Sequence, residues 1–208
     1  MYRFLLIVFI GITGFNVLAQ DSNLPTTKAS PKNLTVRPER NPLIYMSTST
    51  GINNNTGLIG FDFDIPVSKN ISIDAGPGAG TWNYKIYAGV KYYLKSCQVG
   101  YAFGTGLTYC TGLYHDKHDL TTIYGNVEPI EYNKNPQTNM VFSVYKYWHL
   151  GKRQSRWYVQ TGWTVPLTYG PKITQVTGIT MSSRTMTSLS SYAPGGPIAA
   201  IGVSLGIH

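Results

Sequence analysis

Large apolar side chains alternate with small or polar ones along most of the chain from Leu43 onward, and this period of two residues is what most limits its fold. In the stretch Tyr84–Leu94, one set of alternate positions is apolar or aromatic, and the other set includes Lys85 and Lys91. Successive side chains of a β-strand point to opposite faces, so the pattern predicts strands with one apolar face. Eight such runs are found, at Leu43–Thr50, Leu58–Val67, Ile71–Gly80, Tyr84–Leu94, Gln98–Gly112, Thr138–Leu150, Arg156–Tyr169 and Pro197–His208.

The length of these runs indicates strands that close into a barrel. Most of them reach the roughly nine to eleven residues that a tilted strand needs to cross a bilayer, whereas strands of ordinary globular proteins average about five or six. The spacing of three to four residues that is typical of an amphipathic helix is not seen between them. We therefore expect an all-β protein in which residues 43–208 form an eight-stranded antiparallel up-and-down transmembrane β-barrel.

The alternation does not by itself tell which face turns inward, but three features favour an apolar face turned toward lipid. Aromatic side chains such as Trp157 and Trp163 flank that face, and the opposite face is rich in glycine and alanine, as a narrow interior requires. The two long links, 113–137 and 170–196, fall on the side opposite the tight turns, as extracellular loops do in outer-membrane barrels. The alternative is a soluble lipocalin-like carrier of a small apolar ligand, with the apolar face inward.

The N-terminal residues predict export. Residues 1–19 have a basic start at Arg3, a short apolar core and Ala19 at the expected cleavage point, which are the features of a secretory signal peptide. Residues 20–42 are polar and proline-rich, which is typical of a flexible tail, here in the periplasm. The chain has 17 basic and 9 acidic residues, but the basic ones are scattered along an exported chain, so we expect no nucleic-acid partner.

With these features the chain resembles the small bacterial outer-membrane β-barrel proteins, in particular the OmpA-type eight-stranded barrels and their relatives in Bacteroidota. The resemblance covers about Leu43–His208 and rests on the signal peptide, the Tyr84–Leu94 strand, the glycine-rich fifth run and the closing segment Ile201–His208. We expect a bacterial outer-membrane location and a non-enzymatic structural or binding role, as an accessory subunit of a larger envelope complex. The expected partners are outer-membrane lipids and other envelope proteins, and the sequence identifies no small-molecule ligand and no cofactor.

Five charged residues lie on the small, polar face of neighbouring strands and predict a charge network inside the barrel: Asp62, Asp64, Asp74, Lys85 and Lys91. An eight-stranded barrel is just wide enough to be filled by its own side chains, and buried charges are costly unless they pair. We therefore expect a narrow, salt-bridged lumen, which acts as a plug and not as a pore.

The histidines are the natural starting point for a catalytic or metal site. His115 and His118 lie in the first long link among acidic residues, but their spacing matches no strong metal-ligand motif. Some barrels of this size modify lipids, and such an enzyme is the third hypothesis, although the charged inner face disfavours an acyl pocket. We expect no catalytic residue and no metal.

Two further expectations concern the strand ends. Cys97 and Cys110 lie at opposite ends of one expected strand, about 40 Å apart at ~3.3 Å per residue, which predicts two free thiols. The tight turns carry basic residues without an acid, which favours anionic lipid headgroups on the periplasmic side; these residues are Lys69, Lys95, Lys152 and Arg153.

Overall fold

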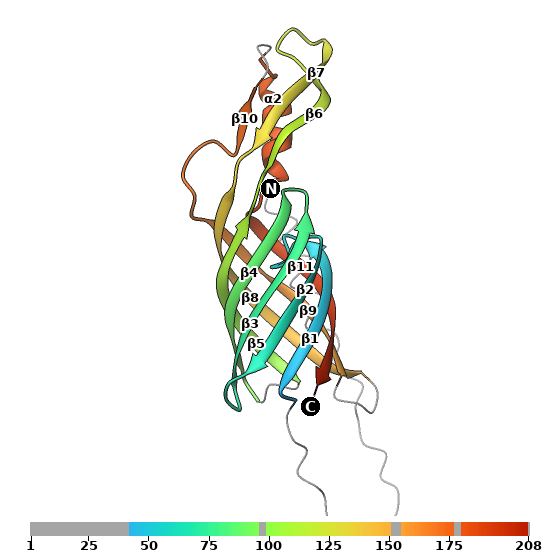
Figure 1. Cartoon of the computed structure of the whole chain (residues 1–208), viewed down its shortest axis with the longest axis vertical. Coiled ribbons are helices and arrows are strands. Elements are labelled where there is room, and N and C mark those ends of the chain that lie inside the picture. The colour runs from blue at the N-terminus through green and yellow to red at the C-terminus, as the bar shows by residue number, and fades with distance from the viewer. Residues whose placement is uncertain (1–41, 96–98, 151–154, 177–179, 208) are drawn as a thin grey trace, which may run out of the picture. The chain divides into compact units, whose positions relative to one another are not determined.

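Eight strands form a closed barrel in the computed structural model, which describes residues 42–95, 99–150, 155–176 and 180–207 (Figure 1). Around the barrel the order is β1, β11, β9, β8, β5, β4, β3 and β2, and every neighbouring pair is antiparallel. The strands are β1 (Ile44–Ile52), β2 (Ile59–Pro66), β3 (Ile71–Gly80), β4 (Asn83–Tyr93), β5 (Gly100–Cys110), β8 (Gln137–Leu150), β9 (Ser155–Pro166) and β11 (Gly196–Ile207).

The all-β class and the eight barrel strands expected from the alternation are confirmed, with ends that differ by a few residues. β3 occupies Ile71–Gly80, as expected, and β9 ends at Pro166 where the expected strand ran on to Tyr169. Proline has no amide hydrogen to donate to the next strand, so the ladder stops there. Within the described ranges, no helix has the length and apolar character to span a bilayer.

The expected N-terminal segments cannot be compared with the structure. The chain divides into two compact units, Met1–Glu39 and Arg40–His208, and the described residues belong to the second. The signal peptide, residues 1–19, and all of the 20–42 tail except Pro42 lie outside them.

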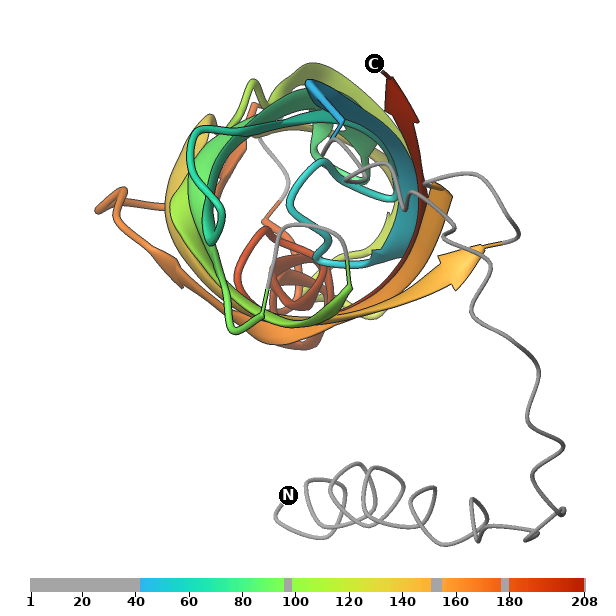
Figure 2. The same ribbon diagram turned by 90° about the horizontal axis from the view of Figure 1, so that it is seen from below.

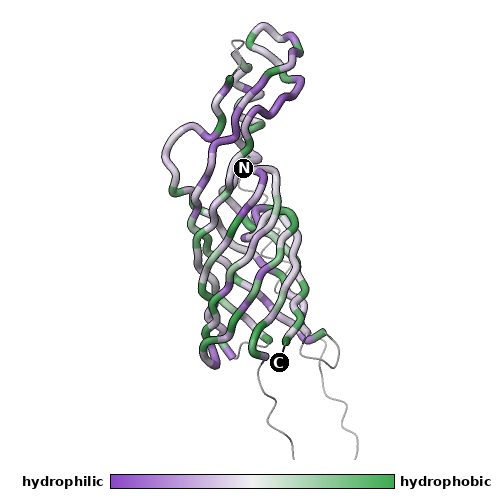
Figure 3. Tube along the Cα trace, viewed as in Figure 1, coloured by the Kyte–Doolittle hydropathy of each residue, from purple (hydrophilic) through white to green (hydrophobic). Residues whose placement is uncertain are grey.

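The large apolar side chains of the strands point outward and the charged ones point inward. Phe61, Phe103 and Trp163 are 58%, 48% and 51% exposed on the outer surface, whereas Asp62 and Lys91 are 6% and 2% exposed. Figure 3 shows the same contrast along the chain: hydrophobic residues recur on the barrel strands, and hydrophilic residues dominate the hairpin above them. The barrel is therefore inverted relative to a water-soluble one, because its apolar surface is outside and its polar groups form the interior.

The two long links were expected as loops, and this was wrong, because much of each is regular structure. The first forms the hairpin of β6 (Leu113–Thr121) and β7 (Val127–Lys134), and the second contributes β10 (Ile173–Gln175) and α2 (Ser183–Ser191). The order β10-β7-β6 makes a small sheet beyond the barrel mouth. We call these four elements the extension.

A small apolar core holds the extension together and joins it to the barrel mouth. Ile130 and Tyr132 of the hairpin pack with Ile173 and Met181, and Trp82, between β3 and β4, belongs to the same buried cluster. The Trp82 indole N–H donates to the Asn135 carbonyl oxygen at 2.9 Å. The extension is thus anchored on the barrel by an aromatic side chain with its polar atom satisfied.

Candidate functional site

The polar interior of the barrel is the candidate site, because all five charged residues expected there are buried in it. Asp62 and Asp64 lie on β2, Asp74 on β3, and Lys85 and Lys91 on β4, and each is at most 6% exposed. The structure brings four of them into one cluster. Lys85 lies apart from that cluster, closer to the extension.

Lys91 is the centre of the cluster. Its Nζ lies 2.9 Å from Asp74 Oδ2, 3.5 Å from Asp62 Oδ2 and 3.7 Å from Asp64 Oδ2. Strand register explains the grouping, since Asp64 and Asp74 are direct cross-strand partners and Lys91 pairs with Ser72, two residues before Asp74. Facing carboxylates repel each other across a strand pair. A lysine reaching between them offsets this repulsion and makes their burial tolerable.

Arg156 is the functional residue that the sequence reasoning left out of the network. It lies on β9, is 1% exposed, and donates from Nη2 to Asp64 Oδ2 at 2.6 Å. Its guanidinium lies over the rings of Tyr45 and Tyr147, at 3.7 and 4.2 Å from their centroids. Arg156 lies at an inward-facing position of β9, and the alternation of residues in the sequence had already assigned it to the polar, inward face. Only the closed barrel shows that β9 lies across the lumen from β2.

With Arg156 included, the buried charges of the described barrel strands balance. Three carboxylates, those of Asp62, Asp64 and Asp74, stand against the three cations Lys85, Lys91 and Arg156. An unpaired charge in a poorly hydrated interior costs several kcal/mol, and pairing offsets most of that cost. Neutrality is therefore what a filled lumen requires.

Aromatic rings fill the lumen around the ion cluster. Tyr93, Tyr145, Tyr147 and Tyr158 form a buried group whose ring centroids lie 5.1 to 5.9 Å apart. The Tyr93 hydroxyl donates to Asp64, so the rings are tied to the charges. Glycine makes room for them: a Cβ at Gly202 would overlap the Tyr158 ring.

The β1–β2 connection folds into the barrel and closes the mouth, which the sequence did not predict. Asn54, Asn55 and Thr56 are at most 5% exposed. The Asn55 amide donates to the Tyr145 hydroxyl at 2.7 Å and accepts from Gln160 Nε2 at 2.7 Å. Figure 2, a view along the barrel from below, shows this link curling into the interior. The cavity left between the loop and the Lys91 cluster measures about 10 Å³, room for about one water molecule.

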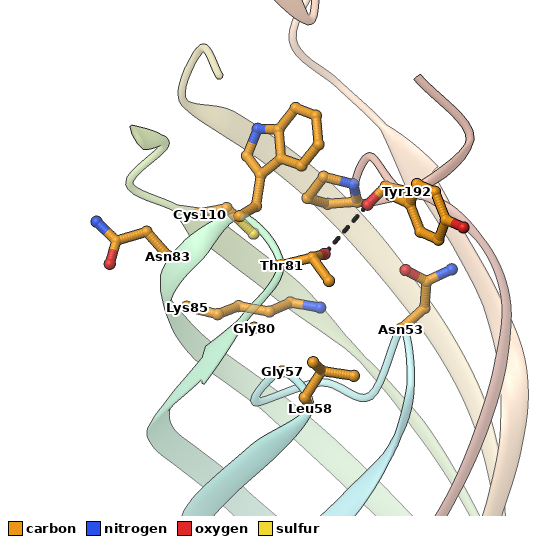
Figure 4. Close-up of a pocket in the computed structure, with 11 residues that line it drawn as sticks. Asn53, Gly57, Leu58, Gly80, Thr81, Asn83, Lys85, Cys110 and Tyr192 are labelled. Carbon is orange, nitrogen blue, oxygen red and sulfur yellow. Dashed lines mark hydrogen bonds between the residues drawn. The ribbon is translucent and has the colours of Figure 1, made fainter. Parts of the chain in front are cut away.

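Lys85 lines a second cavity, of about 40 Å³, at the barrel mouth, where Tyr192 and Pro194 of the segment after α2 complete the wall (Figure 4). Its Nζ donates to the Asn54 carbonyl oxygen at 2.7 Å, and no carboxylate of the described residues lies within 4.0 Å of it. Cys110, the direct cross-strand partner of Lys85, is a buried free thiol. Cys97 lies outside the described residues, so the prediction for the pair is tested at Cys110 alone.

Two acidic residues of the first long link, Asp116 and Glu131, pair with basic and histidine side chains on the extension. Lys134 Nζ lies 2.8 Å from Asp116 and His118 Nε2 lies 3.1 Å from it, while Glu131 pairs with His115 and Lys117. Among the residues that the structure describes, no group of three or more histidine, cysteine, aspartate or glutamate side chains is arranged so that it could hold a metal ion.

These pairs shift the ionisation of their members. Partial burial alone raises the pKa of Asp116, but the hydrogen bond and charge of Lys134 outweigh it and hold that pKa below its ordinary value. The hydrogen bond from His115, with Lys117 beside it, lowers the pKa of Glu131. Burial and the neighbouring Asp116 raise the pKa of Tyr132 to about 12. The pairs thus favour the charged carboxylates and the neutral phenol, which stabilises the hairpin.

Comparisons of the chain with protein-family models, with curated proteins and with solved structures find no match. The functional argument therefore depends on the geometry described above.

Proposed function

We propose that the protein is a non-enzymatic β-barrel of the bacterial outer membrane, with a closed lumen and a structural or binding role carried by its outer parts. The single observation that carries this proposal is the direction of the strand side chains. The large apolar side chains of the strands form the outer surface of the barrel, which a single lysine, Lys146, interrupts, and the other charged groups of the strands lie inside it, where Lys91 and Arg156 pair with aspartates. Water does not solvate such a surface well, whereas the hydrocarbon of a bilayer matches it.

Aromatic residues at the two ends of the outer surface support a bilayer placement. On β4, Tyr84 near the mouth and Tyr92 near the tight turns both point outward and are 65% and 51% exposed. The eight residue-to-residue steps from Tyr84 to Tyr92 span about 26 Å along the strand, or about 20 Å of height at a tilt of ~40°. Outer-membrane barrels have an apolar band ~25 Å tall between two aromatic girdles, so the dimensions agree.

The filled interior supports a plug and weighs against a carrier or a pore. A lipocalin-like carrier needs an apolar cavity, and the described lumen instead holds an ion cluster and a space of about 10 Å³. We expect purified protein in planar bilayers to show no stable conductance. Steady, large single-channel currents would contradict the plug.

The extension is the part best suited to bind a partner outside the cell. Its β6–β7 hairpin ends in three exposed apolar side chains, Ile123, Tyr124 and Val127, which are 55%, 80% and 67% exposed. Apolar side chains gathered at the tip of an ordered hairpin are typical of contact surfaces. This supports the accessory-subunit role, with envelope proteins or proteins outside the cell as the class of partner.

A pair of lysine substitutions tests the membrane placement directly. Leu107 lies outward near the middle of β5, 52% exposed, and Tyr124 is exposed on the extension. In a bilayer, Leu107→Lys destabilises the folded barrel by about 2–4 kcal/mol, whereas Tyr124→Lys stays in water and costs little. In a soluble barrel both lysines meet water, and the two variants have equal stability. Urea unfolding in lipid vesicles measures the difference, and equal midpoints refute the proposal.

Location and topology are tested in cells. We expect the protein in the carbonate-resistant membrane fraction, with a mobility on SDS gels that changes on boiling. Tyr124→Cys should react with a membrane-impermeant maleimide on intact cells, and Lys69→Cys, in a tight turn, should react only after lysis. Recovery of the protein in the soluble fraction, or labelling of position 69 alone, contradicts the placement.

A further inference from the structure

One lysine interrupts the apolar outer surface of the barrel. On the eight barrel strands, all of them within the described residues, the outward positions carry a single charged side chain, that of Lys146 on β8. Its outward neighbours along the strand are Val144 and Trp148. A cation facing hydrocarbon is costly, so this position calls for a physical reason.

Two aromatic rings lie close to the ammonium group of Lys146. Lys146 Nζ lies 4.0 Å from the ring centroid of Tyr101, its direct cross-strand partner on β5, and 5.8 Å from that of Trp148. Trp148 stacks on Trp157 of β9, with ring centroids 4.2 Å apart and planes at 11°. Three strands therefore contribute to one aromatic cluster, in which the cation lies over Tyr101 and beside the stacked tryptophans.

The site lies at the level of lipid headgroups, on the side of the tight turns. Trp148 is two residues from Leu150, where β8 ends, and Tyr101 is the second residue of β5. The Leu94 amide donates to the Tyr101 carbonyl oxygen at 3.0 Å, which places Lys95, the next residue and also exposed, beside the same edge. Tryptophan and tyrosine favour this interfacial zone, where the apolar part of the ring meets lipid and the polar edge meets water.

The ring contacts do not neutralise the cation. No carboxylate of the described residues lies within 4.0 Å of Lys146 Nζ. A cation–π contact engages one side of the ammonium group and leaves N–H donors directed away from the ring. In the interfacial zone, the anion that meets these donors is the phosphate of a lipid.

We propose that Lys146, Tyr101, Trp148 and Trp157 form a binding site for the phosphate of an anionic glycerophospholipid in the leaflet on the side of the tight turns. Lys146 donates to the phosphate, the stacked indoles pack against the glycerol and upper acyl region, and Lys95 adds a second positive charge. A second cation and the absence of a nearby acid favour a headgroup with net negative charge over a zwitterionic one. This inference rests on the proposed membrane placement.

Quenching by brominated lipids tests the site, because tryptophans that would contact the lipid belong to it. The protein is folded into vesicles in which dibrominated phosphatidylglycerol or dibrominated phosphatidylcholine replaces part of an unlabelled phosphatidylcholine matrix. We expect phosphatidylglycerol to be preferred about fivefold in the bromolipid-accessible fluorescence, with the preference falling as salt is added. In Lys146→Gln the preference should fall to about twofold or less.

Matched variants separate charge at this site from charge elsewhere. Lys117→Gln removes an exposed lysine of the extension and should leave the preference unchanged, and Lys146→Arg should retain it. Equal quenching by the two lipids in the wild-type protein overturns the inference, as does an unchanged preference in Lys146→Gln. The boiling-dependent gel shift is measured on the same vesicles. Its absence overturns the membrane placement and this inference together, whereas a shift without lipid preference overturns this inference alone.

Discussion

Replacement of Lys91 by methionine is expected to destabilise the barrel more than replacement of any other lumen lysine. The ammonium group lies within 3.7 Å of three carboxylates. Asp64 keeps its 2.6 Å contact with Arg156 in the variant, but Asp62 and Asp74 lose the one cation that the described residues place within 4.0 Å of them. Removing one partner of a buried ion pair costs about 3–5 kcal/mol, so we expect a loss of that size or more.

Lys85→Met is the matched control. Lys85 is also a buried lysine of β4, but its partner is the Asn54 carbonyl oxygen and not a carboxylate. The loss of one charge-assisted hydrogen bond destabilises the variant. The removal of a buried cation that has no acid within 4.0 Å among the described residues offsets part of that loss. We expect a cost below about 2 kcal/mol. The free energy of unfolding is measured by urea titration in vesicles, with tryptophan fluorescence as the signal.

A double-mutant cycle gives the result that refutes this reasoning. Asp74 is the carboxylate nearest to Lys91, so Asp74→Asn in the Lys91→Met background removes a charge that has lost its partner and should recover about 1–3 kcal/mol. If Lys91→Met and Lys85→Met cost the same, or if Asp74→Asn adds its full cost in both backgrounds, the ion cluster does not stabilise the lumen as argued.

Two further predictions concern packing and pH. Gly202→Ala should destabilise the barrel by about 1–3 kcal/mol in the same urea assay, because the new methyl group overlaps the Tyr158 ring. Gly80→Ala should cost less than about 1 kcal/mol, because its Cβ would meet atoms no nearer than 3.5 Å. Equal costs for the two variants would refute the packing argument. The pKa of Tyr132, raised to about 12 by burial and Asp116, lies above its unfolded value, so its contribution to stability is complete below pH ~10 and is lost as the pH rises through 12. The absorbance at 295 nm of the wild-type protein minus that of Tyr132→Phe should therefore rise near pH 12, and a rise near pH 10 would contradict the buried environment.

The barrel was predictable from the sequence because each strand carries its own signal. A period of two residues is local, and it assigned Asp62 and Lys91 to one face and Phe61 and Phe103 to the other without knowledge of the partner strands. Neighbouring strands in an up-and-down barrel follow the chain order, so the pairing of β2, β3 and β4 also followed. The grouping of Asp62, Asp64 and Asp74 around Lys91 depends on that pairing alone.

The parts that were missed depend on contacts between distant segments. Arg156 reaches Asp64 across the lumen, and Asn55 enters the barrel to meet Tyr145 and Gln160; neither contact has a periodic signature. The β6–β7 hairpin was missed because it rises beyond the barrel with most of its β6 side chains in solvent, so its strands show little apolar alternation. Helix α2 has no fully buried residue, and its contact with the core is made by two partly buried side chains, Met186 and Leu189, which are too few to form a repeating apolar pattern in the sequence.

The filling of the lumen determines where this protein can act. From the tight turns to the mouth, the interior is occupied in turn by the Arg156–tyrosine group, the Lys91 cluster and the inserted Asn54–Thr56 loop, and the space left beside that cluster is about 10 Å³. A solute or a peptide could enter only by breaking neutralised ion pairs that lie in a poorly hydrated interior, at a cost of several kcal/mol for each charge exposed. Binding at the outer parts carries no such cost, because the tip of the extension and the Lys146 site are already exposed or half-buried in the folded protein. A partner of this barrel is therefore expected to leave the Lys91 cluster unchanged and to contact the extension or the apolar outer wall.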